Sequence, residues 1–189
     1  QGFFLGEHDL MDKRWIYEEA MRMPLIVHYP AGVKQKSTNN WLINNTDFAP
    51  TILAFARVET PAYMQGRSFA AAIHGEAKPA DWRKATYYRY WMHMAHNLRV
   101  PAHFGLRTDR YKLIFFYGTT PDGKNPTPVA WEFYDLAQDP QEMQNKYEDP
   151  KYATKIAELK EELQKKRQKL RETDDNFPAV QGIIDIHWN

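Results

Sequence analysis

A short segment near the start of the sequence, GEHDLMDKRW at residues 6–15, concentrates side chains that can do chemistry. It carries three carboxylates, a histidine, a lysine and an arginine within ten positions. A lysine ammonium about 3 to 4 Å from a developing oxyanion interacts with it by about 4 kcal/mol at an effective dielectric constant near 20. Lys13 has this chemistry, although its residue type alone is more typical of an exposed loop.

Asp12 and Arg14 flank Lys13 in this segment. In an extended loop they point away from the lysine, and a carboxylate paired with a guanidinium can read neighbouring sugar hydroxyls through charge-assisted hydrogen bonds. The alternative is a local salt bridge from Arg14 to Glu18 or Glu19. Both interpretations stay open at the level of sequence.

Histidines gather in a second segment, where His93, His96 and His103 fall within eleven positions. Their spacing lacks the acidic partner of the common helical zinc motifs, and the segment reads as strand and loop, so we do not predict a zinc site. Hydrogen bonds to backbone carbonyls are one role for these side chains. His8 is equally open, since it can line a pocket or bond the backbone.

The first half of the chain predicts the end of an α/β layer. PLIVHYP at residues 24–30 is a short apolar run typical of a buried strand. Residues 44–58 predict a loop leading into a helix, with Thr46 or Asp47 as the cap and Pro50 in the first turn. A strand, a loop and a helix in this order fit an α/β architecture.

From about Arg83 onward the pattern changes to aromatic and β-branched runs separated by turn residues. We predict an antiparallel sheet of about four strands from ATYYRYWM, HFGLRTD, YKLIFFYG and WEFYDL. Arg107, Arg110 and Lys112 are expected to point outward from it without a specific function. Residues 149–173 predict a helix, capped by Asp149 and followed by a tail without clear periodicity.

The overall composition excludes several classes of function. The 25 Lys and Arg balance 24 Asp and Glu, so no general field exists to hold nucleic acid or an acidic membrane. No apolar stretch approaches the roughly 18 residues that span a bilayer. Without cysteine the chain offers no disulfide, thiolate nucleophile or Cys-ligated zinc, and the redox compartment stays undetermined.

Four segments, in order, resemble the C-terminal part of the type I, formylglycine-dependent sulfatases. They are QGFFLGEHDLMDKRWIYEEAMRMPLIVHYP, TDFAPTILAFARVETPAYMQGRSF, GLRTDRYKLI and WEFYDLAQDPQEMQN. The resemblance runs from Gln1 to about Glu172. It implies an alkaline-phosphatase/sulfatase-like α/β fold, in which residues 1–80 end the large catalytic domain and residues 81–189 form a subdomain with an antiparallel sheet and a terminal helix.

The resemblance also implies a calcium site that this chain holds only in part. In the family the first motif follows a Ser-Asp pair, and the Asp and the next Asn or Gln bind Ca²⁺. Here Gln1 occupies the second ligand position, and an amide oxygen suits this cation. The formylglycine nucleophile, made from a Cys or Ser far upstream, has no counterpart in these 189 residues. We therefore expect an inactive fragment of a longer parent protein.

The family's functional residues map onto the two segments described first. Lys13 matches the lysine that reaches the sulfate group, which makes it the candidate catalytic residue. The Asp-Lys-Arg version of the motif resembles glycan-acting members, so Asp12 and Arg14 are candidate sugar contacts. Sulfatases acting on 6-sulfated hexosamines carry a similar histidine-rich loop before GLRTDRYKLI. His103 is thus the preferred substrate contact, with His93 and His96 as weaker candidates.

The parent protein is accordingly expected to hydrolyse sulfate esters on a glycan such as 6-sulfated N-acetylhexosamine, in a periplasmic, secreted or lysosomal compartment. A phosphate or phosphonate ester hydrolase of the same superfamily is one alternative. A non-catalytic carbohydrate-binding module is another. Because residues such as Leu25 and Ile26 need cover, the isolated chain is expected to self-associate or to leave its first 20 residues disordered.

Overall fold

The computed structural model describes residues 2–33 and 37–188. These residues form two compact units. One combines residues 2–23 with 87–188, and the other comprises the described residues of 24–86. The boundary at residues 80/81 stays a prediction about the parent protein. In the chain itself, the N-terminal segment packs with the C-terminal sheet.

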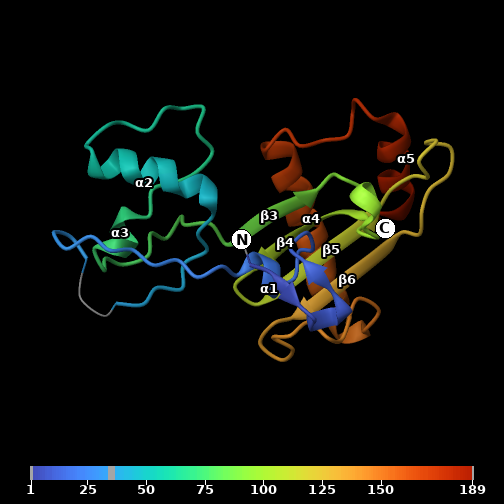
Figure 1. The fold of residues 1–189 in the computed structure, drawn as a ribbon, viewed down its shortest axis with the longest axis horizontal. Coiled ribbons are helices and arrows are strands. Elements are labelled where there is room, and N and C mark those ends of the chain that lie inside the picture. The colour runs from blue at the N-terminus through green and yellow to red at the C-terminus, as the bar shows by residue number, and fades with distance from the viewer. Residues whose placement is uncertain (1, 34–36, 189) are drawn as a thin grey trace. The chain divides into compact units, whose positions relative to one another are not determined.

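The larger unit is organised around an antiparallel sheet, which confirms the four predicted strands (Figure 1). Its strand order follows the sequence. The strands are β3 (Ala85–Tyr90), β4 (Ala102–Thr108), β5 (Tyr111–Tyr117) and β6 (Ala130–Asp135). His103 lies opposite Phe116 and Arg107 opposite Lys112 in the β4–β5 pair. Because side chains alternate along a strand, this register assigns every strand residue to one face of the sheet.

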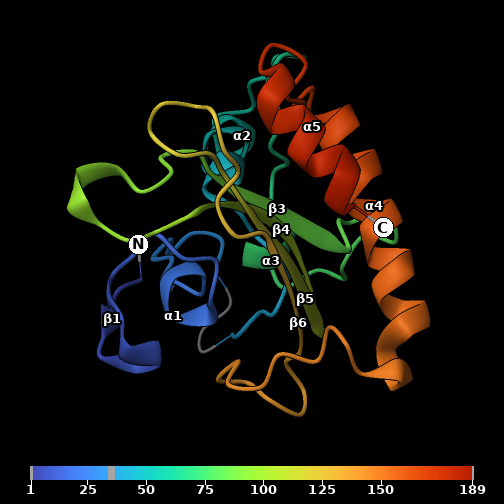
Figure 2. The same cartoon turned by 90° about the vertical axis from the view of Figure 1, so that its right-hand side faces the viewer.

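Two helices cover one face of this sheet, and the N-terminal segment covers the other (Figure 2). The predicted helix is confirmed as η4 (Pro150–Tyr152) followed by α4 (Ala153–Lys169), and the Asp149 carboxylate accepts the N–H of Lys151 at 3.0 Å. α4 buries Ile156, Leu159 and Leu163. The tail forms a further helix, α5 (Pro178–His187), which the sequence periodicity did not indicate.

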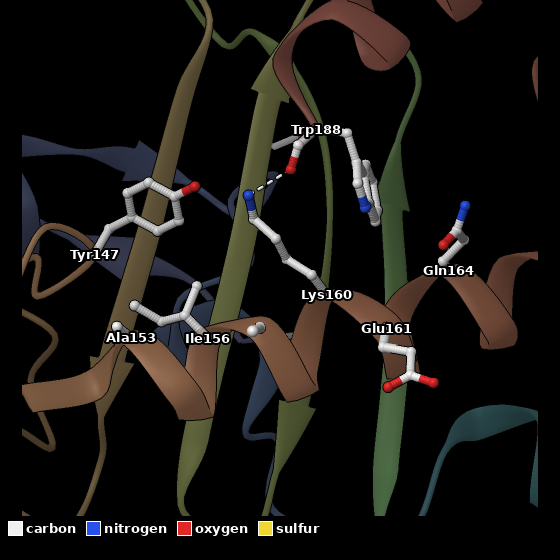
Figure 3. Close-up of a pocket in the computed structure, with 8 residues that line it drawn as sticks. Tyr147, Ala153, Ile156, Lys160, Glu161, Gln164 and Trp188 are labelled. Atoms are coloured by element: carbon white, nitrogen blue, oxygen red, sulfur yellow. Dashed lines mark hydrogen bonds between the residues drawn. The ribbon is translucent and has the colours of Figure 1, made fainter. Parts of the chain in front are cut away.

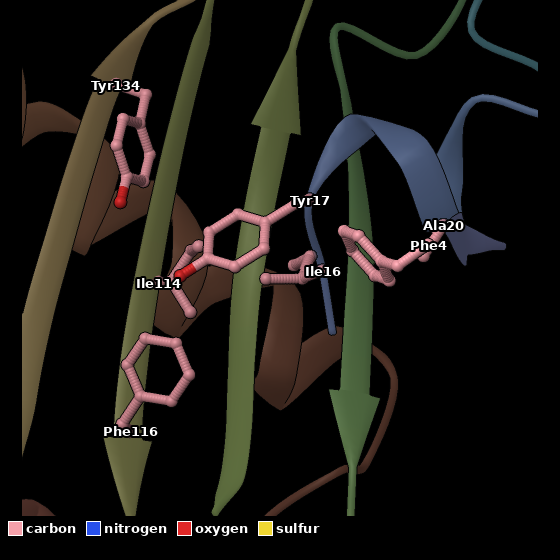
Figure 4. Close-up of a cluster of buried hydrophobic side chains, with 7 residues drawn as sticks. All are labelled: Phe4, Ile16, Tyr17, Ala20, Ile114, Phe116 and Tyr134. Atoms are coloured by element: carbon pink, nitrogen blue, oxygen red, sulfur yellow. The ribbon is translucent and has the colours of Figure 1, made fainter. Parts of the chain in front are cut away.

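The N-terminal segment, residues 2–23, folds as a small hairpin and a helical turn. Its elements are β1 (Phe4–Leu5), η1 (Glu7–Asp9), β2 (Met11–Asp12) and α1 (Glu18–Met21). Phe4, Ile16 and Tyr17 pack against Ile114 and Phe116 of β5 (Figure 4). Of the two outcomes expected for the isolated chain, disorder is not observed in residues 2–20, which are ordered here, and self-association stays a prediction.

The smaller unit contains η2 (Asn45–Asp47), α2 (Phe48–Phe55) and α3 (Ala70–Ile73). Asp47 is fully buried; its carboxylate accepts the N–H groups of Asn44 and Arg67 and pairs with Arg83. The strand predicted at residues 24–30 is wrong, because no strand forms there. A strand needs a neighbour to take its backbone hydrogen bonds, and none lies beside it among the described residues.

No helix in the described ranges combines the length and apolar character that crossing a membrane requires. The loop between β3 and β4 contains one short turn, η3 (Ala95–Asn97).

Candidate functional site

Lys13 directly follows β2 and extends into solvent from the N-terminal segment. The β1–β2 hairpin pairs Phe4 with Asp12, and Asp12 adopts a φ of 102°, a conformation that L-residues rarely take. Such backbone strain is typical of functional loops. Within the described chain no carboxylate lies at ion-pair distance from Lys13, so its ammonium is available to an external anion.

Asp12 and Arg14 form an ion pair with each other. The alternative partners considered for Arg14 are wrong. Glu18 pairs with Arg107 and Lys112, and Glu19 lies 3.5 Å from the His8 ring. The pair holds a carboxylate and a guanidinium together beside Lys13, and their role as sugar contacts stays a prediction.

His8 packs on the N-terminal segment itself. Its ring stacks on Tyr17, with 4.5 Å between ring centroids and nearly parallel planes. Its φ of 54° helps to form the turn between β1 and β2. The described contacts of the His8 ring, the stack on Tyr17 and the approach to Glu19, match neither of the two roles considered for it, so both stay predictions.

The residues after Lys13 attach the segment to the sheet. The Tyr88 hydroxyl donates to the carbonyl of Arg14 at 2.9 Å. Trp15 stacks on His103, with ring centroids 5.8 Å apart, and the Tyr17 hydroxyl donates to Glu132 at 2.8 Å. The fold thus brings the Asp-Lys-Arg segment and His103, about 90 positions apart, into one region.

His103 is fully buried in this region. Its Nδ1–H donates to the carbonyl of Pro101 at 2.8 Å, and Nε2 has no partner in the part of the chain that the structure describes. Burial lowers the pKa of His103 to about 4, against the opposing effect of that hydrogen bond, so the ring is neutral near pH 7. A ligand reaches Nε2 only if the side chains around it move, and the predicted substrate contact remains a prediction.

His93 and His96 occupy different positions in the loop before β4. His93 Nδ1 accepts the N–H of Ala102 at 2.9 Å. The ring packs directly on Gly118, where any side chain would clash with it, because an added Cβ would lie 2.2 Å from His93 Cε1. Burial also lowers the pKa of His93. His96 is exposed in η3 with a φ of 57°. His93 therefore anchors the loop to the start of β4, and the substrate roles of both histidines stay predictions.

A metal site is not formed by the residues that the structure describes. No group of three or more His, Asp or Glu side chains gathers among them in a way that could hold a cation. Gln1, the predicted calcium ligand, lies outside the described residues. The described residues alone therefore do not fit a calcium ion, and none of their chemistry is derived through one.

The ion pairs of the β4–β5 hairpin were not foreseen from the sequence. Lys112 was expected to point outward, but it is fully buried, and its Nζ lies 3.0 Å from Glu18 and 2.7 Å from Glu142. Arg107 pairs with Glu18 and Arg110 with Asp135. The alternation of side chains along β5 could have indicated that Lys112 is buried, since it lies on the same face as the buried Ile114 and Phe116.

A separate pocket of about 580 Å³ lies over α4 and contains none of the predicted site residues (Figure 3). Its central side chain, Lys160, donates to the backbone carbonyl of Trp188 and lies 4.4 Å from the centroid of the Trp131 ring. Lys160 thus caps the C-terminal end of α5, and this structural role explains its position without a ligand.

Comparison with known proteins matches this chain to sulfatases. Residues 6–169 match the family described as N-sulphoglucosamine sulphohydrolase, C-terminal. An N-acetylglucosamine-6-O-sulfatase of Bacteroides thetaiotaomicron is 45% identical over 175 residues, which are 92% of this chain and 30% of that protein. The chain spans about a third of the length of the relatives it matches.

Solved structures show the same similarity. One, described as in complex with its substrate D-glucosamine-2-N,6-O-disulfate, is 43% identical, has a TM-score of 0.84, and is matched over 94% of this chain and 34% of its own. The phosphonate monoester hydrolase from Silicibacter pomeroyi is 25% identical with a TM-score of 0.66, over 86% of this chain and 32% of that one. These matches confirm the predicted fold, the end of a sulfatase-like α/β domain followed by an antiparallel sheet with a packed helix.

Proposed function

The chain belongs to the family of N-sulphoglucosamine sulphohydrolase C-terminal domains, and from this premise we propose that it is the C-terminal part of a sulfatase. The parent enzyme hydrolyses sulfate esters on a glycan such as 6-sulfated N-acetylhexosamine. The names of its relatives support the sugar and the reaction. The observation that carries the role of this chain is the exposed Lys13, which has no ion-pair partner among the described residues. It lies beside the Asp12–Arg14 pair, in a turn where the φ of Asp12 is positive.

Lys13 acts on the sulfate group. When the S–O bond to the sugar breaks, negative charge grows on the bridging oxygen, and an ammonium held close to it lowers the energy of that state. The same charge attracts the sulfate of the bound substrate, so part of the interaction goes to binding rather than to rate. The attacking group, a formylglycine in this proposal, and the rest of a calcium site belong to the upstream part of the parent.

Asp12, Arg14 and His103 contact the sugar in this proposal. The ion pair presents acceptor and donor groups together, which suits two neighbouring hydroxyls. His103 contributes its Nε2 after the side chains that bury it move aside. This atom has no partner among the residues described, and the ring is uncharged near pH 7. His93 and His96 act through the shape of the loop that leads into β4, and His96 is the more accessible of the two.

The test uses the complete enzyme and 6-sulfated N-acetylglucosamine, with released sulfate measured by ion chromatography. Lys13→Ala is expected to lower kcat/KM by about 100-fold or more, the usual effect of removing one group that stabilises an oxyanion. Lys124→Ala is the matched control, because Lys124 is an exposed loop lysine whose side chain is 78% accessible. Undiminished turnover by Lys13→Ala would falsify the proposed role.

A phosphonate ester hydrolase is the second candidate, favoured by the similarity to the Silicibacter pomeroyi enzyme. Paired assays of the complete enzyme on an aryl sulfate and on an aryl phosphonate distinguish the two. We expect the sulfate ester to be the better substrate, and a higher kcat/KM on the phosphonate ester reverses the assignment. If neither ester is hydrolysed, calorimetric titration with sulfated and unsulfated hexosamine tests for a carbohydrate-binding module.

A further inference from the structure

Four charged side chains meet under the N-terminal segment and form a buried ion cluster, defined as Glu18, Arg107, Lys112 and Glu142. Lys112 and Glu142 are fully shielded from solvent, and the side chain of Glu18 is only 13% accessible. Lys112 Nζ lies between the two carboxylates, and Arg107 lies 3.0 Å from Glu18 on its other side. Two cations and two carboxylates leave the cluster without net formal charge.

The ion cluster joins four parts of the fold that are remote in sequence. Glu18 begins α1, five residues after Lys13, while Arg107 and Lys112 belong to β4 and β5. Glu142 lies in the loop after β6, and its carboxylate accepts the backbone N–H of Glu18 at 2.7 Å. Both the side chain and the backbone of Glu18 are therefore held, which fixes the end of the loop that carries Lys13.

Apolar contacts hold the same segment in a different way. Phe4, Ile16 and Tyr17 bury surface against the sheet, but such contacts are not directional and tolerate small sliding movements. In the ion cluster, Arg107 donates two hydrogen bonds to the Glu18 carboxylate, and the Glu142 carboxylate accepts the Glu18 N–H. Charge-assisted hydrogen bonds of this kind fix both distance and orientation. They carry a desolvation cost that a well-packed apolar contact avoids, so added stability alone does not account for four charges here.

We propose that the ion cluster is a positioning site that sets where the Lys13 ammonium stands relative to the sulfate ester. This role rests on the proposed function of Lys13. A displacement of about 1 Å of a group that acts on the reacting atoms lowers rates by roughly 100-fold. Lys112, Glu18 and Glu142 act through Lys13 and do not touch substrate.

The test uses the complete enzyme and a double variant, Lys112→Met/Glu142→Gln. It removes one charge of each sign, so no buried charge is left uncompensated, and Glu18 keeps Arg107. A glutamine at position 142 can still accept the N–H of Glu18. The matched control is Arg110→Gln/Asp135→Asn, which neutralises the ion pair between the β4–β5 turn and the end of β6. The described contacts of this pair do not involve residues 2–23.

Three measurements decide the outcome. Hydrogen exchange of peptides covering residues 7–20 is expected to quicken at least tenfold in the double variant and to stay unchanged in the control. The double variant is expected to lose at least tenfold in kcat/KM on 6-sulfated N-acetylglucosamine, mainly in kcat, while its melting temperature stays close to that of the control. Adding Lys13→Ala to the double variant is expected to lower kcat/KM by a much smaller factor than Lys13→Ala does in the wild type. The reason is that the effects of groups that act as a unit are not additive.

Unchanged exchange in residues 7–20, or full additivity with Lys13→Ala, overturns the positioning role. If the complete enzyme releases no sulfate at all, the proposed function fails, and the exchange measurement still decides whether the cluster holds the segment. Glu18→Gln gives a milder variant should the double variant not fold. It keeps the backbone hydrogen bond to Glu142 and the Lys112–Glu142 pair, and an unchanged exchange rate in this variant also contradicts the role.

Discussion

The two faces of the four-stranded sheet hold different segments of the chain (Figure 2). The face under α4 and α5 is apolar at its centre, where β4 and β5 present four side chains with no exposed surface: Phe104, Leu106, Leu113 and Phe115. α4 adds Leu163, which is also fully buried. Buried ion pairs lie on this face as well. Arg89 of β3 pairs with Glu172 and Asp174, and Arg167 of α4 pairs with Asp174. They tie the end of α4 and the segment after it to the sheet.

The opposite face, under the N-terminal segment, mixes apolar and polar groups. The same two strands present His103, Arg107 and Lys112 to it, and Glu18 and Glu142 complete the ion cluster. These contacts are directional, and they hold the segment that carries Lys13. Both faces therefore combine apolar burial with ion pairs. They differ in what the ion pairs hold: the end of α4 and the segment after it on one face, and the segment that carries Lys13 on the other.

The largest expected effect separates the two faces by truncation of matched aromatic residues. Phe104→Ala, on the helix face, is expected to destabilise the protein by about 3–5 kcal/mol in urea unfolding. Phe4→Ala, on the other face, is expected to cost less globally, because the N-terminal segment can open locally before the sheet unfolds. Hydrogen exchange then quickens in residues 2–23 alone. The distinction is contradicted if both variants lose the same free energy of unfolding and if hydrogen exchange quickens throughout the chain in both.

A second prediction concerns His103, whose pKa burial lowers to about 4. The unfolded chain takes up a proton near pH 6.5 and the native state only near pH 4, so stability falls as pH drops through this window. The loss is up to about 3 kcal/mol. NMR titration of the ring should give the low pKa. The variant His103→Phe should lack this part of the destabilisation by acid. A pKa near 6.5 for His103 in the native state would contradict the prediction.

A third effect, of similar size and opposite sign, tests the ion cluster. Burial raises the pKa of Glu142 to about 7, although the charge of Lys112 works against this. In Glu18 burial acts in the same direction, but the hydrogen bond from Arg107 and the charge of Lys112 outweigh the effect of burial. The pKa of Glu18 is therefore lowered to about 2. Glu142 therefore keeps its proton longer in the native than in the unfolded state, so its contribution to stability falls as pH rises from 4.5 to 7.

Glu142→Gln removes this titration. The wild type loses stability from Glu142 as pH rises, and the variant does not. The free energy of unfolding of the variant minus that of the wild type should therefore increase between pH 5 and pH 8, as measured by urea unfolding at each pH. A constant difference across that range shows that Glu142 titrates normally in the native state.

The smallest effect is expected on the solvent side of α4, outside both faces. Lys165 pairs with Glu161 one turn away, and both side chains are exposed. Water screens such a pair, so Lys165→Ala should leave both the melting temperature and kcat/KM unchanged. A clear loss in either measurement reveals a role for this surface that the described contacts do not indicate.

Local patterns predicted much of the larger unit. The four strands, the Asp149 cap and the helix after it follow from alternation, turn residues and helical spacing within short windows. α5 was missed, although Pro178 stands at its first position and Ile183 and Ile184 are buried. Ten residues with two buried isoleucines give too weak a period to separate from a loop.

The prediction at residues 24–30 failed for a reason that local patterns cannot reveal. An apolar run indicates a need for cover, but a strand forms only where a neighbour accepts and donates its hydrogen bonds. Ile26 is 90% exposed in this structure. The sequence left the partner of Arg14 open for a similar reason, since three carboxylates lay within reach along the chain and the turn at Asp12 selected one of them.

The sequence by itself determined the strands, the long helix, the family resemblance and the candidate residues at positions 12–14, because each depends on neighbours within a short stretch of chain. Only the tertiary structure decided that Lys112 is buried, that His103 lies against Trp15, and that Glu142 holds Glu18 from 124 positions away. The physical reason is that burial and charge pairing depend on which distant segments meet, and local spacing does not encode that choice.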